Sequence, residues 1–180
     1  MISDRIKALS PYKTETTQAR VRLSSNELPL LLPPEVKRRI GEEVSKIPIN
    51  KYPDPHAEEL KEAIAQVFGV QPHNLVLGNG SDELIYYLSI AVGEFDKGVF
   101  YPIPTFPMYG ISSKILGRER VEVPLSEDMD IDLETSLSAI KEKKPILSFI
   151  SYPNNPTGAC FNGEKIKRIR EEGLFMVIDE

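Results

Sequence analysis

Hydrophobic positions follow a helical spacing in the first part of the chain. Between residues 33 and 47 they fall on one face, after two prolines that favour a helix start. The positions are Val36, Ile40, Val44 and Ile47. A second stripe of this kind ends at Gly69, a common helix terminator, and carries Leu60, Ile64, Val67 and Phe68. The pattern predicts two amphipathic helices, separated by a turn at Tyr52-Pro53-Asp54-Pro55.

From residue 75 onward, short apolar runs alternate with longer amphipathic segments. We predict strands at 75–77, 98–101, 120–123, 145–150 and 174–178, and helices near 81–92, 107–116, 132–142 and 163–172. The helix at 81–92 is apolar on most sides, so we expect it to be buried. Strands alternating with helices indicate an α/β fold with a mainly parallel sheet and right-handed crossovers.

These patterns divide the chain into three segments. Residues 1–32 show no clear period and form an expected N-terminal arm, residues 33–74 a helical segment, and residues 75–180 the first part of a larger α/β domain. The chain stops directly after an apolar strand, with no helix to cover that strand. We therefore expect it to be a piece of a longer protein.

Loops rich in Gly, Pro, Asn and Asp follow the predicted strands. They are Gly78-Asn79-Gly80-Ser81-Asp82, Pro102-Ile103-Pro104-Thr105-Phe106, Tyr152 to Gly158, and Asp179-Glu180. In an open α/β sheet, ligands bind in the crevice beyond the carboxyl ends of the strands. The sequence therefore predicts one binding site to which all four loops contribute.

Composition narrows the range of functions. The 180 residues carry a formal net charge of −5 and show no basic face, which argues against nucleic acid as a partner. No apolar run approaches the length that spans a membrane, and no apolar signal core follows Met1. Cys160 is the single cysteine, which excludes an intramolecular disulfide framework and fits a reducing cytoplasm.

The loop Asn154-Asn155-Pro156-Thr157-Gly158, together with Asp179 on the next strand, resembles pyridoxal-phosphate aminotransferases of the aspartate-aminotransferase-like superfamily. The closer resemblance is to the histidinol-phosphate aminotransferase family. It rests on further segments in the family's order: residues 23–27, 51–54, 78–83 and 104–109. The resemblance implies fold type I, three α/β/α layers around a mixed, mainly parallel sheet. It also implies that about half the enzyme is present and that the small C-terminal domain is absent.

The resemblance assigns the cofactor phosphate to Ser81 and Asp82, where a helix start offers free amides to an anion. Judged alone, Ser81 is better explained as an ordinary helix N-cap, because the three-glycine dinucleotide fingerprint is absent. Phe106 matches the aromatic residue that stacks on the pyridine ring, where the family usually has Tyr. A core aromatic in a proline-rich turn is the alternative.

Asn155 matches the residue that donates a hydrogen bond to the cofactor's phenolate oxygen. A type I turn with Pro156 and Gly158 at its second and fourth positions is the alternative, and both can hold together. Asp179 matches the partner of the protonated pyridine nitrogen, which makes the ring a better electron sink. A strand-end carboxylate that caps the next helix is the alternative.

Three further matches are outside these loops. Tyr52 matches the tyrosine that reaches the phosphate of the neighbouring subunit's cofactor, which implies a homodimer; its alternative is local packing in a turn. Asn26 and Glu27 match a segment near the substrate, although Ser24 stands where Asn is more usual. His56 and His73 are isolated and receive no role, and no metal site is predicted.

The resemblance implies transamination between L-histidinol phosphate and 2-oxoglutarate, giving imidazole-acetol phosphate and glutamate. The lysine that forms the Schiff base is expected beyond residue 180, so this chain alone is expected to be inactive. Three rivals stay open: another fold-type-I enzyme, such as an aromatic aminotransferase or an amino-acid-phosphate decarboxylase; a nucleotide-binding module; and a non-catalytic fragment.

Overall fold

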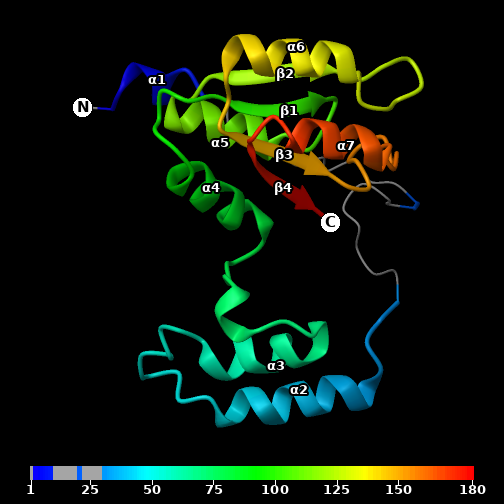
Figure 1. Ribbon diagram of the computed structural model, residues 1–180. Coiled ribbons are helices and arrows are strands. Elements are labelled where there is room, and N and C mark those ends of the chain that lie inside the picture. Colours follow the sequence, from blue (N-terminus) through cyan, green and yellow to red (C-terminus); the bar gives the residue numbers. More distant parts are fainter. Residues whose placement is uncertain (1, 10–19, 22–29) are drawn as a thin grey trace. The chain divides into compact units, whose positions relative to one another are not determined.

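The computed structural model describes residues 2–9, 20–21 and 30–180, and the chain divides into two compact units. One unit joins Met1–Ser10 to Leu77–Glu180 and contains the sheet (Figure 1). The other unit is Pro11–Val76 and its described part is helical. The candidate cofactor residues of the sheet loops all belong to the first unit.

The helical unit confirms both predicted amphipathic helices. Helix α2 covers Pro34–Lys46 and α3 covers Glu58–Phe68, with a short 3₁₀ helix, η1, at Pro72–Asn74. Asp54 stabilises the turn that leads into α3, because its carboxylate accepts hydrogen bonds from the backbone N–H of His56 (2.9 Å) and of Glu58 (2.8 Å), the first residue of the helix. These two bonds lower the pKa of Asp54. Gly69 ends α3 at a φ of 67°, a left-handed conformation that favours glycine.

The predicted strand at 75–77 is wrong. These residues lie between η1 and α4 and form no strand, and the Val76 side chain is 74% exposed. A strand exists only when a neighbouring strand accepts and donates its ladder of hydrogen bonds. No described segment pairs with residues 75–77, so their apolar character alone does not produce a strand.

The other four predicted strands form one sheet. They are β1 (Val99–Ile103), β2 (Arg120–Pro124), β3 (Leu147–Ser151) and β4 (Phe175–Asp179). Their order across the sheet is β2-β1-β3-β4, and each neighbouring pair is parallel. The prediction of a mainly parallel sheet is confirmed, and the carboxyl ends of all four strands share one edge.

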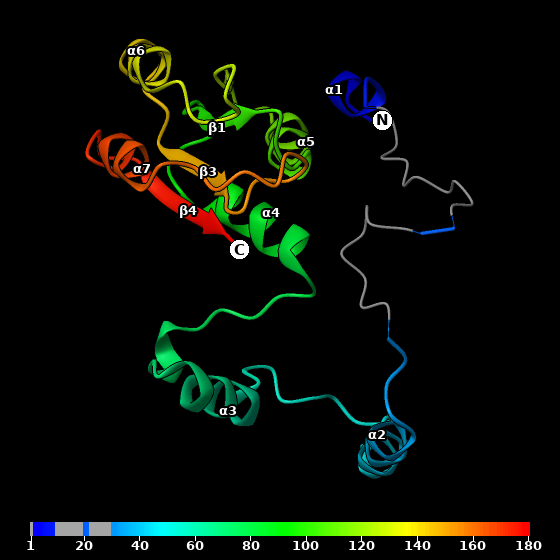
Figure 2. The ribbon, with the colours of Figure 1, turned by 90° about the vertical axis from the view of Figure 1, so that its right-hand side faces the viewer.

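Helices cover both faces of this sheet, in three layers (Figure 2). Helices α4 (Ser81–Ala91) and α5 (Met108–Leu116) pack on one face, and α6 (Leu133–Lys143) and α7 (Gly163–Arg170) on the other. Side chains alternate along β1, so that Val99 and Tyr101 join the α4–α5 core whereas Phe100 joins the α6–α7 core. A short helix, α1 (Asp4–Lys7), also belongs to this unit, and Lys114 of α5 donates a hydrogen bond to the Ala8 carbonyl.

Helix α4 is less buried than its composition predicted. Ile85 and Ser89 are buried, but Tyr87 and Ile90 are 48% and 41% exposed. A helix at the outer layer of an α/β sandwich presents only one face to the sheet. Its remaining apolar side chains are therefore exposed unless other parts of the protein or a partner cover them.

Arg118 anchors the connection between α4 and β1. It is 4% exposed, and its guanidinium donates to four backbone carbonyls: Ser89 (2.7 Å), Val92 (2.8 Å), Lys97 (2.9 Å) and Glu94 (3.3 Å). The first two of these are near the C-terminus of α4, where a cation is favoured. The arginine thus fixes the end of the helix that begins at Ser81.

Replacing Arg118 by methionine is expected to lower the free energy of unfolding by about 2 to 3 kcal/mol, because several carbonyls lose their donor. The midpoint of urea denaturation measures this change. Arg38→Met, on the exposed face of α2, is the matched control and is expected to shift stability by less than about 0.5 kcal/mol. An equally small shift for Arg118→Met would contradict the anchoring role.

Candidate functional site

Asp179 is the last residue of β4 and stands opposite Ser151 of β3 in the register. Its carboxylate oxygen Oδ2 accepts a hydrogen bond of 2.6 Å from the hydroxyl of Tyr109. No arginine or lysine of the described residues pairs with this carboxylate. Its backbone carbonyl accepts from the Tyr152 N–H (2.8 Å) and continues the ladder, so its position comes from the sheet. The alternative, that Asp179 caps the next helix, concerns residues beyond 180 and stays a prediction.

Asn154 ties two of the predicted loops together. It is 1% exposed, and its side-chain oxygen accepts from the Thr105 hydroxyl at 2.9 Å. Its amide nitrogen donates to the Pro104 carbonyl (3.0 Å) and to the Thr157 hydroxyl (2.9 Å). The loop after β1, which carries Phe106, is therefore fixed against the loop after β3, which carries Asn155.

Phe106 is partly buried at the edge of the α4–α5 core. Its ring meets the Tyr109 ring edge to face, with centroids 5.7 Å apart and an angle of 79°. One side of Phe106 thus packs as a core aromatic, as the alternative interpretation held. Because the side chain is only partly buried, the packing leaves ring surface that could contact a planar ligand.

Asn155 is exposed, and its backbone N–H donates to the Ser151 hydroxyl oxygen at 3.2 Å. Its side-chain amide has no hydrogen bond with any described residue. In place of the hydrogen bond expected of a type I turn from Asn155 to Gly158, the Gly158 N–H donates to the Asn154 carbonyl (2.6 Å) and closes a wider turn. Asn154 stabilises this wider turn, because its backbone N–H donates to the Ala159 carbonyl (2.8 Å) while its side chain is fixed by the bonds described above.

The start of α4 is open to an anion. Gly80 is the N-cap, at φ 87° and ψ 168°, and Ser81 is the first helical residue, so the interpretation of Ser81 as the N-cap is wrong. Only glycine adopts this backbone readily, which is why the cap is one residue earlier. Ser81 and Asp82 are exposed, and their backbone N–H groups have no acceptor among the described residues. This arrangement suits a phosphate.

Glu83 shapes the loop that precedes this helix start. Its carboxylate accepts from the Asn79 N–H (2.6 Å) and from the Tyr87 hydroxyl (2.8 Å). These bonds lower the pKa of Glu83. Because the Glu83 carboxylate binds the Asn79 N–H, it does not accept from the exposed backbone N–H groups of Ser81 and Asp82.

Intermediate side chains, among them Tyr109, Asn154 and Ser151, connect Phe106, Asn155 and Asp179. Ser81 begins a helix on the same face of the sheet as Tyr109. Tyr52 lies in the helical unit and is fully exposed there. Asn26 and Glu27 lie outside the described residues. His56 and His73 are exposed, as predicted.

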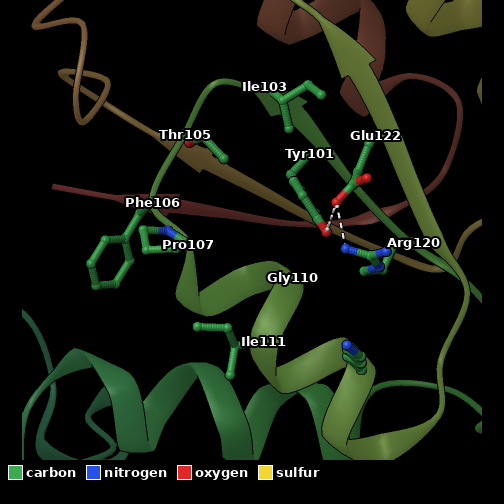
Figure 3. A pocket seen from close by; sticks show the side chains of 10 residues that line it. Tyr101, Ile103, Thr105, Phe106, Pro107, Gly110, Ile111, Arg120 and Glu122 are labelled. Carbon is green, nitrogen blue, oxygen red and sulfur yellow. Dashed lines mark hydrogen bonds and ion pairs between the residues drawn. The ribbon is translucent and has the colours of Figure 1, made fainter. Parts of the chain in front are cut away.

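A pocket of about 340 Å³ is lined by residues of α5 and of the paired strands β1 and β2 (Figure 3). Its polar groups satisfy one another: Tyr101 donates to the Glu122 carboxylate (2.7 Å), and Arg120 donates to the same oxygen (3.1 Å). Phe106 lines its rim, with the ring directed away from this network. Asp179 does not line it, because β4 is at the opposite edge of the sheet from β2, and Asn155, which follows β3, does not line it either.

The sequence analysis assigned no role at the site to Tyr109, Asn154 or Ser151. Tyr109 follows Phe106 by three residues, a spacing that places two side chains on one face where a helix begins, and this could have identified it. Asn154 joins two loops far apart in sequence through Thr105 and Pro104, and Ser151 stands opposite Asp179 on the neighbouring strand. No local pattern reports either relation.

Residues 19–180 match the family model described as aminotransferase class I and II, so the chain belongs to that family. Among its relatives is the histidinol-phosphate aminotransferase of Aquifex aeolicus (strain VF5), with 60% identity over the whole chain and 51% of that protein. The enzyme of the same name from Thermococcus gammatolerans is 43% identical over the whole chain and 52% of its own length.

Solved structures agree with this family. Histidinol-phosphate aminotransferase from Sinorhizobium meliloti, in complex with pyridoxal-5'-phosphate, superposes with a TM-score of 0.82 at 25% identity, over 99% of this chain and 50% of that one. An aspartate aminotransferase mutant from Thermus thermophilus gives 0.80 at 24% identity over the whole chain and 50% of its own, which shows the shared fold. The chain spans about half the length of the relatives it matches. None of the described helices is long and apolar enough to cross a membrane.

Proposed function

We propose that the protein is a pyridoxal-phosphate-dependent aminotransferase that acts on L-histidinol phosphate and 2-oxoglutarate. The observation that carries the cofactor assignment is the Asp179 carboxylate, which is held at the sheet edge by a neutral tyrosine donor and has no cationic partner among the described residues. The substrate assignment rests on the names of the relatives, several of which are histidinol-phosphate aminotransferases.

The residues present fit the cofactor. The open amides of Ser81 and Asp82 would hold its phosphate, the partly buried Phe106 ring would stack on its ring, and the unpaired Asn155 amide would donate to its phenolate oxygen. Asp179 would keep the ring nitrogen protonated, since an adjacent anion favours the charged form. When bound, the cofactor supplies an electron sink for negative charge at the substrate's α-carbon.

We further propose that the lysine that binds the cofactor covalently is not among the described lysines. Lys165 pairs with Asp130 (2.8 Å) and Lys167 with Glu164 (2.6 Å) on α7, whereas Asp179 hydrogen-bonds Tyr109 in the core on the other face of the sheet. Lys114 of α5 donates to the Ala8 carbonyl.

Treating the 180-residue chain with pyridoxal phosphate and then sodium borohydride should therefore leave no single lysine stoichiometrically labelled by mass spectrometry. The chain should also fail to transfer an amino group from glutamate to an oxo acid. The full-length protein is the positive control and should acquire one label. Stoichiometric labelling of one lysine of the chain, with turnover, would contradict this part of the proposal.

The proposed assembly is a homodimer in which Tyr52 reaches the partner's cofactor. Its support is that Tyr52 is fully exposed and that α2 presents an exposed apolar stripe: Val36, Ile40, Val44 and Ile47. Exposed apolar surfaces of this kind are typical of interfaces. A cytoplasmic location is also part of the proposal and rests on the single free cysteine, Cys160.

Steady-state kinetics of the full-length protein test the reaction. L-Histidinol phosphate should give a higher kcat/KM than aromatic amino acids or aspartate, and amino transfer should depend on added pyridoxal phosphate. Preference for an aromatic amino acid, or release of carbon dioxide from an amino-acid phosphate, would show that the protein has a different activity on the same fold. Tighter binding of a nucleotide than of pyridoxal phosphate would overturn the proposal.

A further inference from the structure

Tyr109 is the one described side chain that hydrogen-bonds the Asp179 carboxylate. The bond joins the first turn of α5 to the last residue of β4, 70 positions apart, at 2.6 Å. It engages Oδ2, and no described side chain donates to Oδ1. One carboxylate oxygen is therefore taken and the other is available to a ligand.

The tyrosine ring cannot turn away easily. Tyr109 is fully buried, and its ring stacks on Phe149 of β3, with centroids 4.8 Å apart and planes 3° from parallel. It also contacts Phe106 in an edge-to-face arrangement and the tilted ring of Tyr101, with centroids 6.0 Å away. A donor on a ring packed in this way has a fixed direction, so it defines the orientation of the group that accepts from it.

The hydroxyl stays a donor over the physiological pH range. Burial, and then the hydrogen bond to Asp179, raise the pKa of Tyr109 far above its ordinary value. A neutral hydroxyl can satisfy a carboxylate oxygen without neutralising its charge, whereas an arginine or lysine would neutralise it. The negative charge of Asp179 therefore stays available to a cationic ligand group.

Ser151 connects the Tyr109–Asp179 pair to Asn155. Ser151 stands opposite Asp179 in the register, and its hydroxyl oxygen accepts the Asn155 N–H. Ser151 also acts to lower the pKa of Tyr109, against the larger opposite effects of burial and Asp179. Tyr109 thus lies next to Phe106 in the loop after β1 and near the residue that holds the backbone of Asn155 in the loop after β3.

We propose that Tyr109 is a positioning residue for Asp179: its hydroxyl holds Oδ2 and so directs Oδ1 at the protonated nitrogen of the cofactor's pyridine ring. This inference rests on the proposed function and adds a residue to it. The competing explanation is that the bond only ties α5 to β4 and stabilises the fold. The two differ in whether the loss of the hydroxyl affects recognition of the ring nitrogen itself.

The test compares two ligands in the full-length apoprotein: pyridoxal phosphate and its 1-deaza analogue, in which CH replaces the ring nitrogen. Equilibrium titration gives the ratio of the two affinities for the natural protein and for Tyr109→Phe, which keeps the stacked ring. Tyr101→Phe is the matched control, because it removes another buried hydroxyl of the same core that donates to a carboxylate, Glu122, at 2.7 Å.

The natural protein should prefer pyridoxal phosphate, and Asp179→Asn should abolish the preference. Tyr109→Phe should reduce it about tenfold, the size expected when a hydrogen bond to a charged group is lost. Tyr101→Phe should leave it within about twofold. A role in the fold alone would weaken both ligands equally and leave the ratio unchanged.

Three results would overturn the inference. A full preference in Tyr109→Phe would remove Tyr109 from the recognition of the ring nitrogen and leave the proposed function intact. An equal loss of preference in Tyr101→Phe would make the effect a general property of the core. No preference in the natural protein would refute the proposed contact of Asp179 with the ring, and the role of Tyr109 with it.

Discussion

Asp179→Asn is expected to lower kcat for amino transfer in the full-length protein by about 10² to 10³-fold, the range found when one group that stabilises transition-state charge is removed. An asparagine can still accept from Tyr109 through its oxygen. It would then present its NH₂ group to the ring nitrogen, which favours an unprotonated ring. The ring would therefore be a poorer electron sink, although the fold and the hydrogen bond at Oδ2 are kept.

Single-turnover kinetics with a saturating amino donor measure this loss separately from product release. Asp96→Asn is the control, since Asp96 is an exposed aspartate that lies 3.9 Å from the amine of Lys97. It should leave the rate unchanged. If Asp179→Asn lowers the rate by less than about threefold, the loss is far below that expected for such a group, and the proposed contact of Asp179 with the ring nitrogen is contradicted.

Asn154→Leu is expected to lower the free energy of unfolding by about 2 to 4 kcal/mol. Leucine has a similar size, but it leaves the Thr105 hydroxyl, the Pro104 carbonyl and the Thr157 hydroxyl without their buried partner. The loops that carry Phe106 and Asn155 would also lose their connection. Cofactor affinity should therefore fall along with stability.

The neighbouring asparagine provides the control. Asn155→Ala, at an exposed side chain with no hydrogen bond to described residues, should change stability by less than about 0.5 kcal/mol. It should nevertheless weaken pyridoxal phosphate about tenfold, because the donor to the phenolate oxygen is lost. Urea denaturation and cofactor titration measure the two quantities. If Asn155→Ala is the more destabilising variant, the roles of the two asparagines are reversed.

The parts of the fold that the sequence predicted are those whose signal is local. The run at 145–150 lacks alternation between apolar and polar residues because β3 is covered on both faces. The stripe from Val36 to Ile47 has the helical period whether or not a partner covers it. The run at 75–77 looks equally strand-like. It fails because strand formation depends on a pairing segment, which a local pattern does not report.

At the site, too, local features could be predicted from the sequence and long-range contacts could not. Asp179 and Asn155 could be placed at the sheet edge from their positions after apolar runs, and the family resemblance supplied their roles. The bonds that orient them, from Tyr109 to Asp179 and from Thr105 to Asn154, span 70 and 49 residues. Such contacts depend on how the strands are ordered, β2-β1-β3-β4, and the order is a property of the whole sheet.

A crystal structure of the full-length protein with bound pyridoxal phosphate tests the central claim most directly. The account predicts the ring nitrogen about 2.7 to 2.9 Å from Asp179 Oδ1, with Phe106 on one face of the ring and the phosphate at the amides of Ser81 and Asp82. A cofactor bound elsewhere, for instance in the pocket beside Tyr101 and Glu122, would contradict it. So would an Asp179 carboxylate turned to an arginine or lysine of the protein.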